Sequence, residues 1–387
     1  MSSGKSGGHA VEVHGFCETG FEAVREAFVK NFEKDLEVGA SVVVTRDGKP
    51  LVDIWGGDAD PRGTPWAEDT IVNVYSTTKT MAATCVLMLA DRGLVDLYAP
   101  VADYWPEFAS NGKEGVLVSH VMSHSAGLSG FEPPLETIDA LYDWDAICAR
   151  LAAMEPWWEP GSQSGYHAVT QGYLQGEIVR RVSGRSIGTF FREEVAEPLG
   201  ADFHIGLDPA HDARVGELIP PARSLQSPEM APDSIGVRTF AGAALDATEP
   251  RTSAWRRAEI PAAGGIGNAR SVARVHSALA CGGTLDGVTL MSEAGVARIL
   301  EEQTRGKDLV LGMPIVFGMG FGLNDASFPI SPNPRAFFWG GWGGSLAIVD
   351  LDLRASIVYV MNRMEADLMG DLRGGNIAGA AIQSLMA

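Results

Sequence analysis

Two side chains that can perform nucleophilic chemistry lie three residues apart at the start of an apolar stretch. Ser76 and Lys79 open a run from Val74 to Ala90 that is apolar on most sides and is followed by Gly93, a common helix stop. Such a helix belongs in a protein interior, and the spacing puts both side chains on one face. Burial lowers the pKa of a lysine, which can then serve as the base that serine needs. The pair therefore predicts acyl transfer, with a free N–H at the helix start to bind an oxyanion.

Acyl transfer also needs a proton donor for the leaving group and a second oxyanion donor. Tyr166 follows the helix-breaking stretch 157–162 and is expected to open the next helix, and it is a candidate for the first. We expect Lys79 to lower the pKa of its phenol. The glycine-rich stretch 339–344 at the start of a predicted strand is a candidate for the second, because glycines let a ligand approach the backbone closely. Each motif has a structural alternative: a helix cap with a solvent-directed lysine, a packed tyrosine, or a glycine bulge at a sheet edge.

Composition limits the classes of partner. The chain has 387 residues, of which 45% are hydrophobic, so a large core can form. Its net charge of −19 argues against nucleic acid or an anionic membrane as a partner. The four cysteines are scattered without a Cys-x-x-Cys pair, which indicates neither a disulfide framework nor a zinc cluster. Residues 1–9 are polar and no run approaches 18 apolar residues. We therefore expect a cytoplasmic protein without a cofactor or a metal.

The predicted elements are strands near both ends of the chain and helices between them. Residues 39–57 predict a hairpin around Asp47-Gly48, and strands are predicted at 316–323 and within 337–360. Helices are predicted at 21–37, 76–90, 138–154, 169–182, 187–197, 271–281, 292–303 and 374–385. This order favours an α/β (α+β) fold in which one antiparallel sheet is built from both chain ends.

The same order predicts how the chain is divided. We expect a single unit over residues 1–387, with an α/β subdomain at about 12–72 and 262–387 and a helical subdomain at about 73–261. Residues 1–15 are expected to be flexible, and residues 203–260 carry mixed signals that predict no element.

Three further motifs suggest rival chemistry. Ser186 lies in a Gly-x-Ser-x-Gly sequence, but a helical pattern precedes it where a nucleophile elbow requires a strand, so we expect a loop or cap residue. His120 and His124 are four residues apart without a third ligand, which makes zinc an unfavoured interpretation. The glycines at 318–322 lie inside a strand pattern and do not form a dinucleotide fingerprint.

Taken together, the three motifs resemble those of the serine β-lactamase and penicillin-binding-protein superfamily. They are Ser76-Thr77-Thr78-Lys79, Tyr166 behind Trp158-x-Pro-Gly, and Trp339-Gly340-Gly341 before a strand hairpin. The chain is most similar to the family VIII carboxylesterases, the esterase branch related to class C β-lactamases, over about residues 20–385. The resemblance implies a β-lactamase-like fold.

The resemblance also implies roles for individual residues. Ser76 is expected to be the nucleophile, and Lys79 its proton acceptor or electrostatic partner. Tyr166 is expected to be the general base in acylation and the general acid towards the leaving group, with the order of proton acceptance between Lys79 and Tyr166 left open. The N–H groups of Ser76 and Trp342 are expected to form the oxyanion hole, beside a substrate pocket at Trp339, Gly340 and Gly341.

Two positions depart from the pattern of the penicillin-processing members. Trp339 stands where those proteins have the lysine of Lys-Thr-Gly, and Ala168 stands where they have the asparagine of Tyr-x-Asn. Both changes favour neutral esters over β-lactams. The expected function is therefore hydrolysis of small carboxylic esters, with short-chain or aryl esters suggested by the tryptophans beside the motifs. The alternatives are an acyltransferase, an amide or β-lactam hydrolase, or a catalytically silent binding module; the oligomeric state is open.

Overall fold

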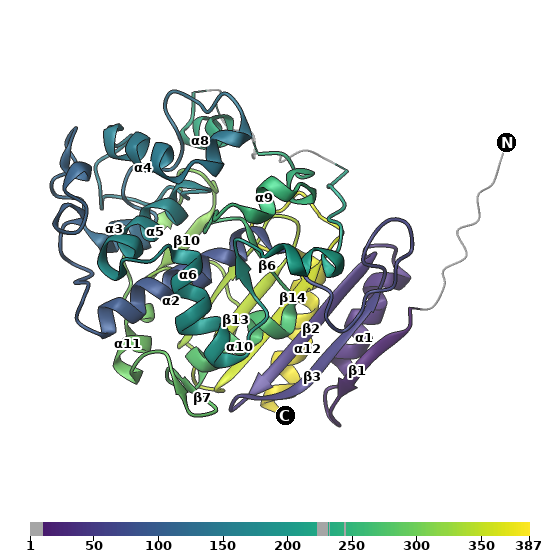
Figure 1. Ribbon diagram of the computed structural model, residues 1–387. Coiled ribbons are helices and arrows are strands. Elements are labelled where there is room, and N and C mark those ends of the chain that lie inside the picture. The colour runs from purple at the N-terminus through teal and green to yellow at the C-terminus, as the bar shows by residue number, and fades with distance from the viewer. Residues whose placement is uncertain (1–10, 223–230, 232, 244) are drawn as a thin grey trace.

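The centre of the molecule is a nine-stranded antiparallel sheet, whose strands run diagonally across the view in Figure 1. The computed structural model describes residues 11–222, 231, 233–243 and 245–387. In sheet order the strands are β1 (Val13–Cys17), β3 (Lys49–Gly57), β2 (Gly39–Arg46), β14 (Ala355–Met361), β13 (Leu346–Asp350), β12 (Ala336–Gly340), β11 (Gly322–Leu323), β10 (Pro314–Phe317) and β9 (Thr304–Lys307). Strands from the two chain ends meet where β2 pairs with β14, so the predicted fold class is confirmed.

The hairpin of β2 and β3 shows why the sequence folds this way locally. Arg46 pairs with Lys49 across a two-residue turn, in which Asp47 and Gly48 have φ of 51° and 75°. Positive φ at both positions is the geometry of a type I′ turn, whose twist matches that of the strands it joins, and Asp-Gly tolerates it. Strand β2 is buried along almost its whole length, because helices cover both faces of the sheet.

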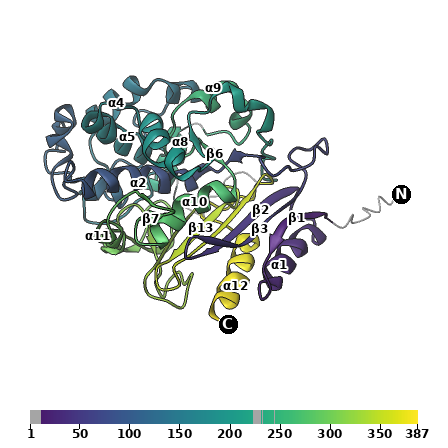
Figure 2. The same ribbon diagram turned by 60° about the horizontal axis from the view of Figure 1, so that its bottom comes forward.

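Helices cover the two faces of the sheet from different parts of the chain. Helices α1 (Glu22–Glu33) and α12 (Leu372–Met386) pack side by side on one face (Figure 2). Helix α10 (Ala269–Ala280) packs on the other face against β2, β13 and β14. All of its residues except Arg270 and Arg274 are buried, and Asn268 caps its N-terminus by accepting from the backbone N–H of Ser271.

Helix α2 (Thr78–Asp91) runs through the interior and is buried from Thr78 to Leu89, as its apolar circumference predicts. It packs against α5 (Thr170–Ser183), α6 (Ile187–Phe191) and α11 (Glu293–Ala297). The remaining α-helices are α3 (Val118–Met122), α4 (Trp144–Ala153), α7 (Glu197–Leu199), α8 (Ile235–Ala243) and α9 (Ser253–Arg257). Short 3₁₀ segments are η1 (Tyr75–Thr77), η2 (Val101–Asp103), η3 (Pro106–Ala109), η4 (Ile138–Tyr142), η6 (Pro209–Arg214), η7 (Glu249–Arg251) and η8 (Arg298–Leu300), and η5 (Arg192–Ala196) is a π-helical turn.

Two small sheets complete the fold. One has the order β4 (Val72–Asn73), β6 (Gly265–Gly267) and β5 (His204–Ile205), and the other pairs β7 (Thr284–Leu285) with β8 (Val288–Thr289). The first of these joins the chain just before Ser76 to the segment that enters α10. It therefore anchors the start of the buried helix to the rest of the molecule.

Several boundaries differ from the sequence expectations. Part of the segment expected to be flexible forms strand β1, which pairs with β3, while residues 1–10 lie outside the described residues. The strand expected at 316–323 is two short strands, β10 and β11, which a turn with Gly320 at φ 87° separates. The unassigned region 203–260 contains β5, α8 and α9, and residues 223–230, 232 and 244 within it lie outside the described residues. The division into subdomains stays a prediction. In the described ranges, no helix is both long and apolar enough to cross a membrane.

Candidate active site

Ser76 lies on the 3₁₀ turn η1, which leads directly into α2, and Ser76 is only 7% exposed. The turn is tied down on both sides: Val74 donates its N–H to the carbonyl of Gly265, and the Thr78 hydroxyl donates to the carbonyl of Tyr75. Tyr75 has φ of 43°, a left-handed value that a bulky residue adopts at a cost of roughly 1–3 kcal/mol. The surrounding bonds therefore hold Ser76 on a strained turn, so that its position is fixed.

Lys79 is buried beneath Ser76, with 1% of it exposed. Its Nζ lies 3.2 Å from Ser76 Oγ, 2.7 Å from the carbonyl oxygen of Ala168 and 3.0 Å from that of Ala262. None of these partners is a carboxylate, and burial holds the pKa of Lys79 well below its ordinary value. A neutral amine has two N–H groups and one lone pair. The two carbonyls can accept the N–H groups, which leaves the lone pair facing the serine hydroxyl.

Tyr166 contacts the same hydroxyl. Its phenol oxygen lies 2.5 Å from Ser76 Oγ, and Lys79 Nζ lies 4.7 Å from the centre of its ring. Tyr166 lies in the loop before α5, which begins at Thr170, so the expectation that Tyr166 opens this helix is wrong. Burial raises the pKa of the phenol, contrary to the expectation that Lys79 would lower it. Burial also lowers the pKa of Lys79, which disfavours the positive charge on which that expectation relied.

Asp308 holds the backbone of Tyr166, a contact that the sequence did not reveal. Its Oδ1 accepts the N–H of Tyr166 at 3.0 Å and the N–H groups of Val310 and Leu311, each at 2.8 Å. The carboxyl is fully buried, which raises its pKa. The aspartate is distant in sequence from every motif and no spacing rule points to it, so only the fold could identify it.

The third motif lies at the end of β12, against the start of α2. A Cβ atom on Gly341 would lie 2.2 Å from the carbonyl oxygen of Val74 and 3.3 Å from the nitrogen of Ser76, so only glycine fits. Ser345 fastens this contact, because its hydroxyl donates to the Val74 carbonyl at 3.0 Å and lies 2.9 Å from the hydroxyl of Thr77. The polar contacts of Ser345 are a second feature that the sequence did not reveal.

Two backbone N–H groups beside the serine are available to a ligand. Within the described part of the chain, no hydrogen bond uses the N–H of Ser76 or that of Trp342. The flanking residues are fixed: Gly341 donates its N–H to Ser345, and Gly344 donates its N–H to Gly341. Two such donors on adjoining segments are what an oxyanion hole requires.

The two departures from the family pattern have visible consequences. Lys79 donates to the backbone carbonyl of Ala168, so a main-chain oxygen takes the place that a side-chain amide could occupy. Trp339 is buried and its ring packs against Tyr166, His124 and Phe317 at centroid distances of 5.4, 5.8 and 5.4 Å. The wall beside Tyr166 is therefore uncharged and aromatic. Gly340 is in turn covered by residues 369–370, where a Cβ atom would lie 2.3 Å from the carbonyl carbon of Met369.

The rival motifs lie elsewhere or serve the fold. Ser186 follows helix α5, caps α6 by accepting from Thr189, and donates to Glu259 at 2.7 Å. The ring nitrogens Nδ1 of His120 and His124 accept backbone N–H groups, and among the described residues no cluster of acidic, histidine or cysteine side chains has the geometry of a metal site. Gly318 and Gly320 lie in the turn between β10 and β11, and Gly322 begins β11.

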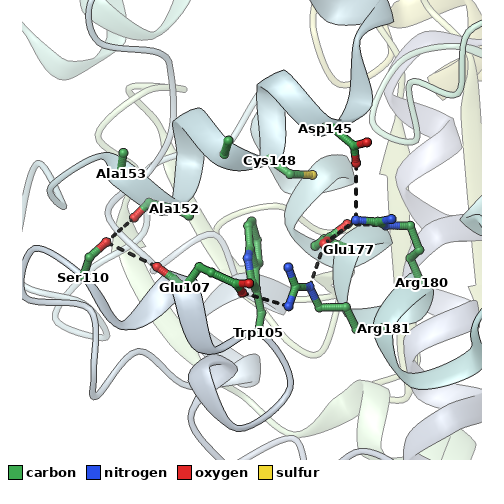
Figure 3. A pocket seen from close by; sticks show the side chains of 11 residues that line it. Trp105, Glu107, Ser110, Asp145, Cys148, Ala152, Ala153, Glu177, Arg180 and Arg181 are labelled. Carbon is green, nitrogen blue, oxygen red and sulfur yellow. Dashed lines mark hydrogen bonds and ion pairs between the residues drawn. The ribbon is translucent and has the colours of Figure 1, made fainter.

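A surface cavity of about 370 Å³ lies away from Ser76, between η3, α4 and α5 (Figure 3). Its charged side chains pair with one another: Glu177 accepts from Arg180 and Arg181, which also contact Asp145 and Glu107. Cys148 also lines the cavity, and burial raises the pKa of its thiol and so keeps it protonated. This cavity therefore offers neither a nucleophile nor a free charge.

Comparisons with known proteins agree with this geometry. The family described as Beta-lactamase matches residues 28–381. Esterase/beta-lactamase LipL of Mycobacterium tuberculosis is 36% identical and aligns over 92% of this chain and 84% of its own. A crystal structure of a family VIII carboxylesterase is 44% identical, with a TM-score of 0.89 over 96% of this chain and 100% of that one. A penicillin-binding protein homolog from Caulobacter crescentus is 43% identical, with a TM-score of 0.90 over the same shares.

Proposed function

The chain belongs to the β-lactamase family, and on that basis we propose that it is a serine carboxylesterase that hydrolyses small esters through an acyl-enzyme on Ser76. One observation carries the proposal: Ser76 Oγ lies within hydrogen-bonding distance of both a buried lysine amine and a buried phenol. Two relatives support it by name: the family VIII carboxylesterase at 44% identity and Esterase/beta-lactamase LipL at 36% identity.

Acylation begins at the hydrogen bond between Ser76 and Lys79. The neutral amine takes the hydroxyl proton as Oγ attacks the ester carbonyl, and the N–H groups of Ser76 and Trp342 bind the resulting oxyanion. When the carbon–oxygen bond to the alcohol breaks, Tyr166 gives its proton to the leaving oxygen. Lys79 then returns the serine proton to the phenolate. In this scheme Lys79 is the first acceptor, because its lowered pKa favours the amine whereas the raised pKa of Tyr166 favours the phenol.

Deacylation follows the same route in reverse, as microscopic reversibility requires. A water molecule enters at the position that the alcohol has left and gives a proton to the Tyr166 and Lys79 pair as it attacks the acyl carbon. The oxyanion again lies between the two backbone donors. Ser76 recovers its proton when the acid leaves, so that the enzyme returns to its starting state.

The preferred substrate in this proposal is a neutral ester with a short acyl chain or an aryl group. The aromatic wall at Trp339 offers no cation to an acidic substrate. The test is a series of nitrophenyl esters of increasing acyl length, with wild type and Ser76→Ala compared. We expect activity that peaks at short chains and is absent from the folded variant. Activity that survives in Ser76→Ala would refute the proposal, and a peak at long chains would refute its substrate class.

A second candidate is hydrolysis of β-lactams on the same serine, which the name of the relative LipL favours. The tryptophan at position 339 weakens this candidate, because the lysine that penicillin-processing members have there helps to hold a substrate carboxylate. Turnover of a chromogenic cephalosporin, compared with that of a nitrophenyl ester, separates the two. Adding a competing alcohol to the ester assay also reveals acyl transfer, because an acyltransferase yields a new ester as well as the acid.

The compartment and the partners belong to the proposal as well. We expect a cytoplasmic enzyme whose partner is a small ester and which uses neither nucleic acid nor a membrane surface, because its net charge is −19. Fractionation of cells that produce the untagged protein tests the compartment. Recovery of the esterase activity outside the cytoplasm would contradict it.

A further inference from the structure

A buried arginine behind the third motif has no part in the scheme above. Arg373, on the first turn of α12, is only 3% exposed, and its guanidinium uses all of its nitrogens. It donates to the carboxylate of Asp371 from Nε and Nη2, and to the carbonyls of Leu36 and Arg363 from Nη1. Nη1 also contacts the carboxylate of Glu37 at 3.3 Å. The contact that matters for the site is that Nη2 donates to the carbonyl oxygen of Gly343 at 2.7 Å.

Gly343 belongs to the turn of residues 341–345, here called the oxyanion turn, which presents the N–H of Trp342. Gly343 and Gly344 have φ of 102° and 127°, values open to glycine and costly for other residues. Two adjacent glycines leave such a backbone free to change shape, because no side chain restricts it. Hydrogen bonds inside the turn, which Gly341 donates to Ser345 and Gly344 donates to Gly341, restrain it in part, and groups outside the turn add to that restraint.

Contacts from the C-terminal segment supply the restraint from outside the turn. The carbonyl of Gly343 accepts from Arg373 and from the N–H of Glu365 at 3.0 Å, and the N–H of Gly343 donates to the carbonyl of Asp367 at 3.1 Å. On the other side of Trp342, Gly341 is held by Ser345. Among these bonds, only the one from Arg373 is donated by a charged side chain. A hydrogen bond from a charged donor is stronger than one between neutral groups.

The charge of Arg373 is itself held in place by acidic neighbours. Asp371 lies 2.6 Å from Nη2, and Glu37 lies 3.3 Å from Nη1 and also accepts from the phenol of Tyr359. A planar guanidinium fixed by a carboxylate on one edge and by carbonyls on the other has little freedom to move. A lysine could not make this set of contacts, because its ammonium lacks the planar fork.

We propose that Arg373 is a positioning residue for catalysis: by holding the carbonyl of Gly343, it keeps the N–H of Trp342 aimed at the oxyanion of the tetrahedral intermediate. The inference rests on the proposed function. It predicts an effect on the transition state and hardly any on ester binding, because the oxyanion forms only after substrate has bound. Loss of an oxyanion donor costs about 10²–10³ in kcat, and a displaced donor should cost part of that, roughly 10- to 100-fold.

The test compares wild type with Arg373→Lys, which retains the charge but not the fork. The concentration of active sites is measured by titrating Ser76 to completion with a fluorophosphonate. Because kcat is calculated from this concentration, unfolded protein does not lower it. We expect kcat to fall roughly 10- to 100-fold while KM stays within about twofold. The inhibition constant of an alkyl boronic acid, whose serine adduct places an oxygen in the oxyanion hole, should rise by the same factor as kcat falls.

Arg270→Lys is the matched control. Arg270 forms a two-point ion pair with Asp53, at 2.6 and 3.1 Å, that joins α10 to β3 far from the oxyanion turn along the chain. Its substitution should lower the melting temperature and leave kcat and the boronic acid constant unchanged. If Arg373→Lys does not fold, Asp371→Asn replaces it as the test variant. This variant keeps a side-chain acceptor at the start of α12 but weakens the ion pair that holds Arg373. We then expect a smaller fall in kcat, with the same parallel rise in the boronic acid inhibition constant.

Three results would overturn the inference: an unchanged kcat in the folded variant, a boronic acid constant that does not follow kcat, or the same loss of kcat in Arg270→Lys. Failure of the proposed function is distinguishable from all three. It would show as absence of fluorophosphonate labelling at Ser76 in the wild-type protein.

Discussion

Replacing Tyr166 by phenylalanine removes a single oxygen from the site. That oxygen lies 2.5 Å from Ser76 Oγ, whereas the ring is held separately by its packing on His124 and Trp339 and the backbone by Asp308. The variant should therefore fold. If Lys79 activates the serine and Tyr166 protonates the leaving group, the cost must depend on whether the leaving group needs a proton.

The size of the loss follows from that dependence. An alkyl ester expels a strongly basic alkoxide, so removing the general acid should lower kcat/KM by about 10²–10⁴-fold, which corresponds to roughly 3–5 kcal/mol in the activation barrier. A nitrophenyl ester expels a weakly basic phenolate that departs without help. Its acylation rate should fall less than about tenfold.

The assay is stopped-flow acylation by esters of one acyl group with alcohols of graded acidity. A plot of the logarithm of rate against leaving-group pKa should be much steeper for Tyr166→Phe than for wild type. Tyr173→Phe is the control, because Tyr173 is also fully buried and its hydroxyl bonds to the Leu141 carbonyl at 2.6 Å, outside the site. Equal losses with both kinds of ester would make Tyr166 the base for Ser76 and refute the assignment of that role to Lys79.

The remaining predictions concern the lysine, the rival serine and a buried carboxyl. Lys79→Ala should lower kcat/KM by about 10³-fold or more. It should also abolish the acidic limb of the pH–rate profile, because wild-type activity should rise as the amine loses its proton. An unchanged acidic limb would show that another group causes it. Ser186→Ala should lower the melting temperature through loss of a helix cap worth about 1 kcal/mol and leave kcat unchanged; loss of turnover would move the site to that serine. Burial raises the pKa of Glu37 to about 7, so between about pH 4 and 7 the folded state keeps a proton that the unfolded chain releases. The contribution of this group to the free energy of unfolding is therefore fully present below about pH 4 and is lost as the pH rises through 7. Glu37→Gln should remove this component, on the order of 3 kcal/mol, from urea titrations between pH 5 and 8; parallel curves would show that Glu37 ionises normally.

Much of the fold could be predicted because it depends on local patterns. Asp47-Gly48 specifies its own turn, and the apolar circumference of residues 78–89 specifies burial. Strand β1 was missed, because pairing with the distant strand β3 decides it and the local pattern does not. The break between β10 and β11 was missed, because glycines expected inside a strand form a turn there, with Gly320 at a φ of 87°.

The site divides in the same way. Ser76 and Lys79 are one helical turn apart, so their contact follows from sequence spacing. Tyr166 was a candidate from its place after a helix breaker, and the resemblance implied its role. The residues that hold them could not be found in this way. Asp308, Ser345 and Arg373 act on backbone atoms more than 25 residues away along the chain, and no motif records which carbonyl or N–H such a side chain will reach. The pKa of Tyr166 was also misjudged, because it depends on how completely the phenol is buried.

The central claim is that Ser76 is the residue that carries the acyl group. Mass spectrometry of protein quenched in acid during turnover of a slowly hydrolysed ester measures this directly, because the adduct can be assigned to a peptide and then to a residue. The account predicts one acyl mass on Ser76, absent from Ser76→Ala and accumulating in a variant slowed in deacylation. An acyl group on Ser186 or another residue, or turnover with no covalent adduct at any time, would contradict it.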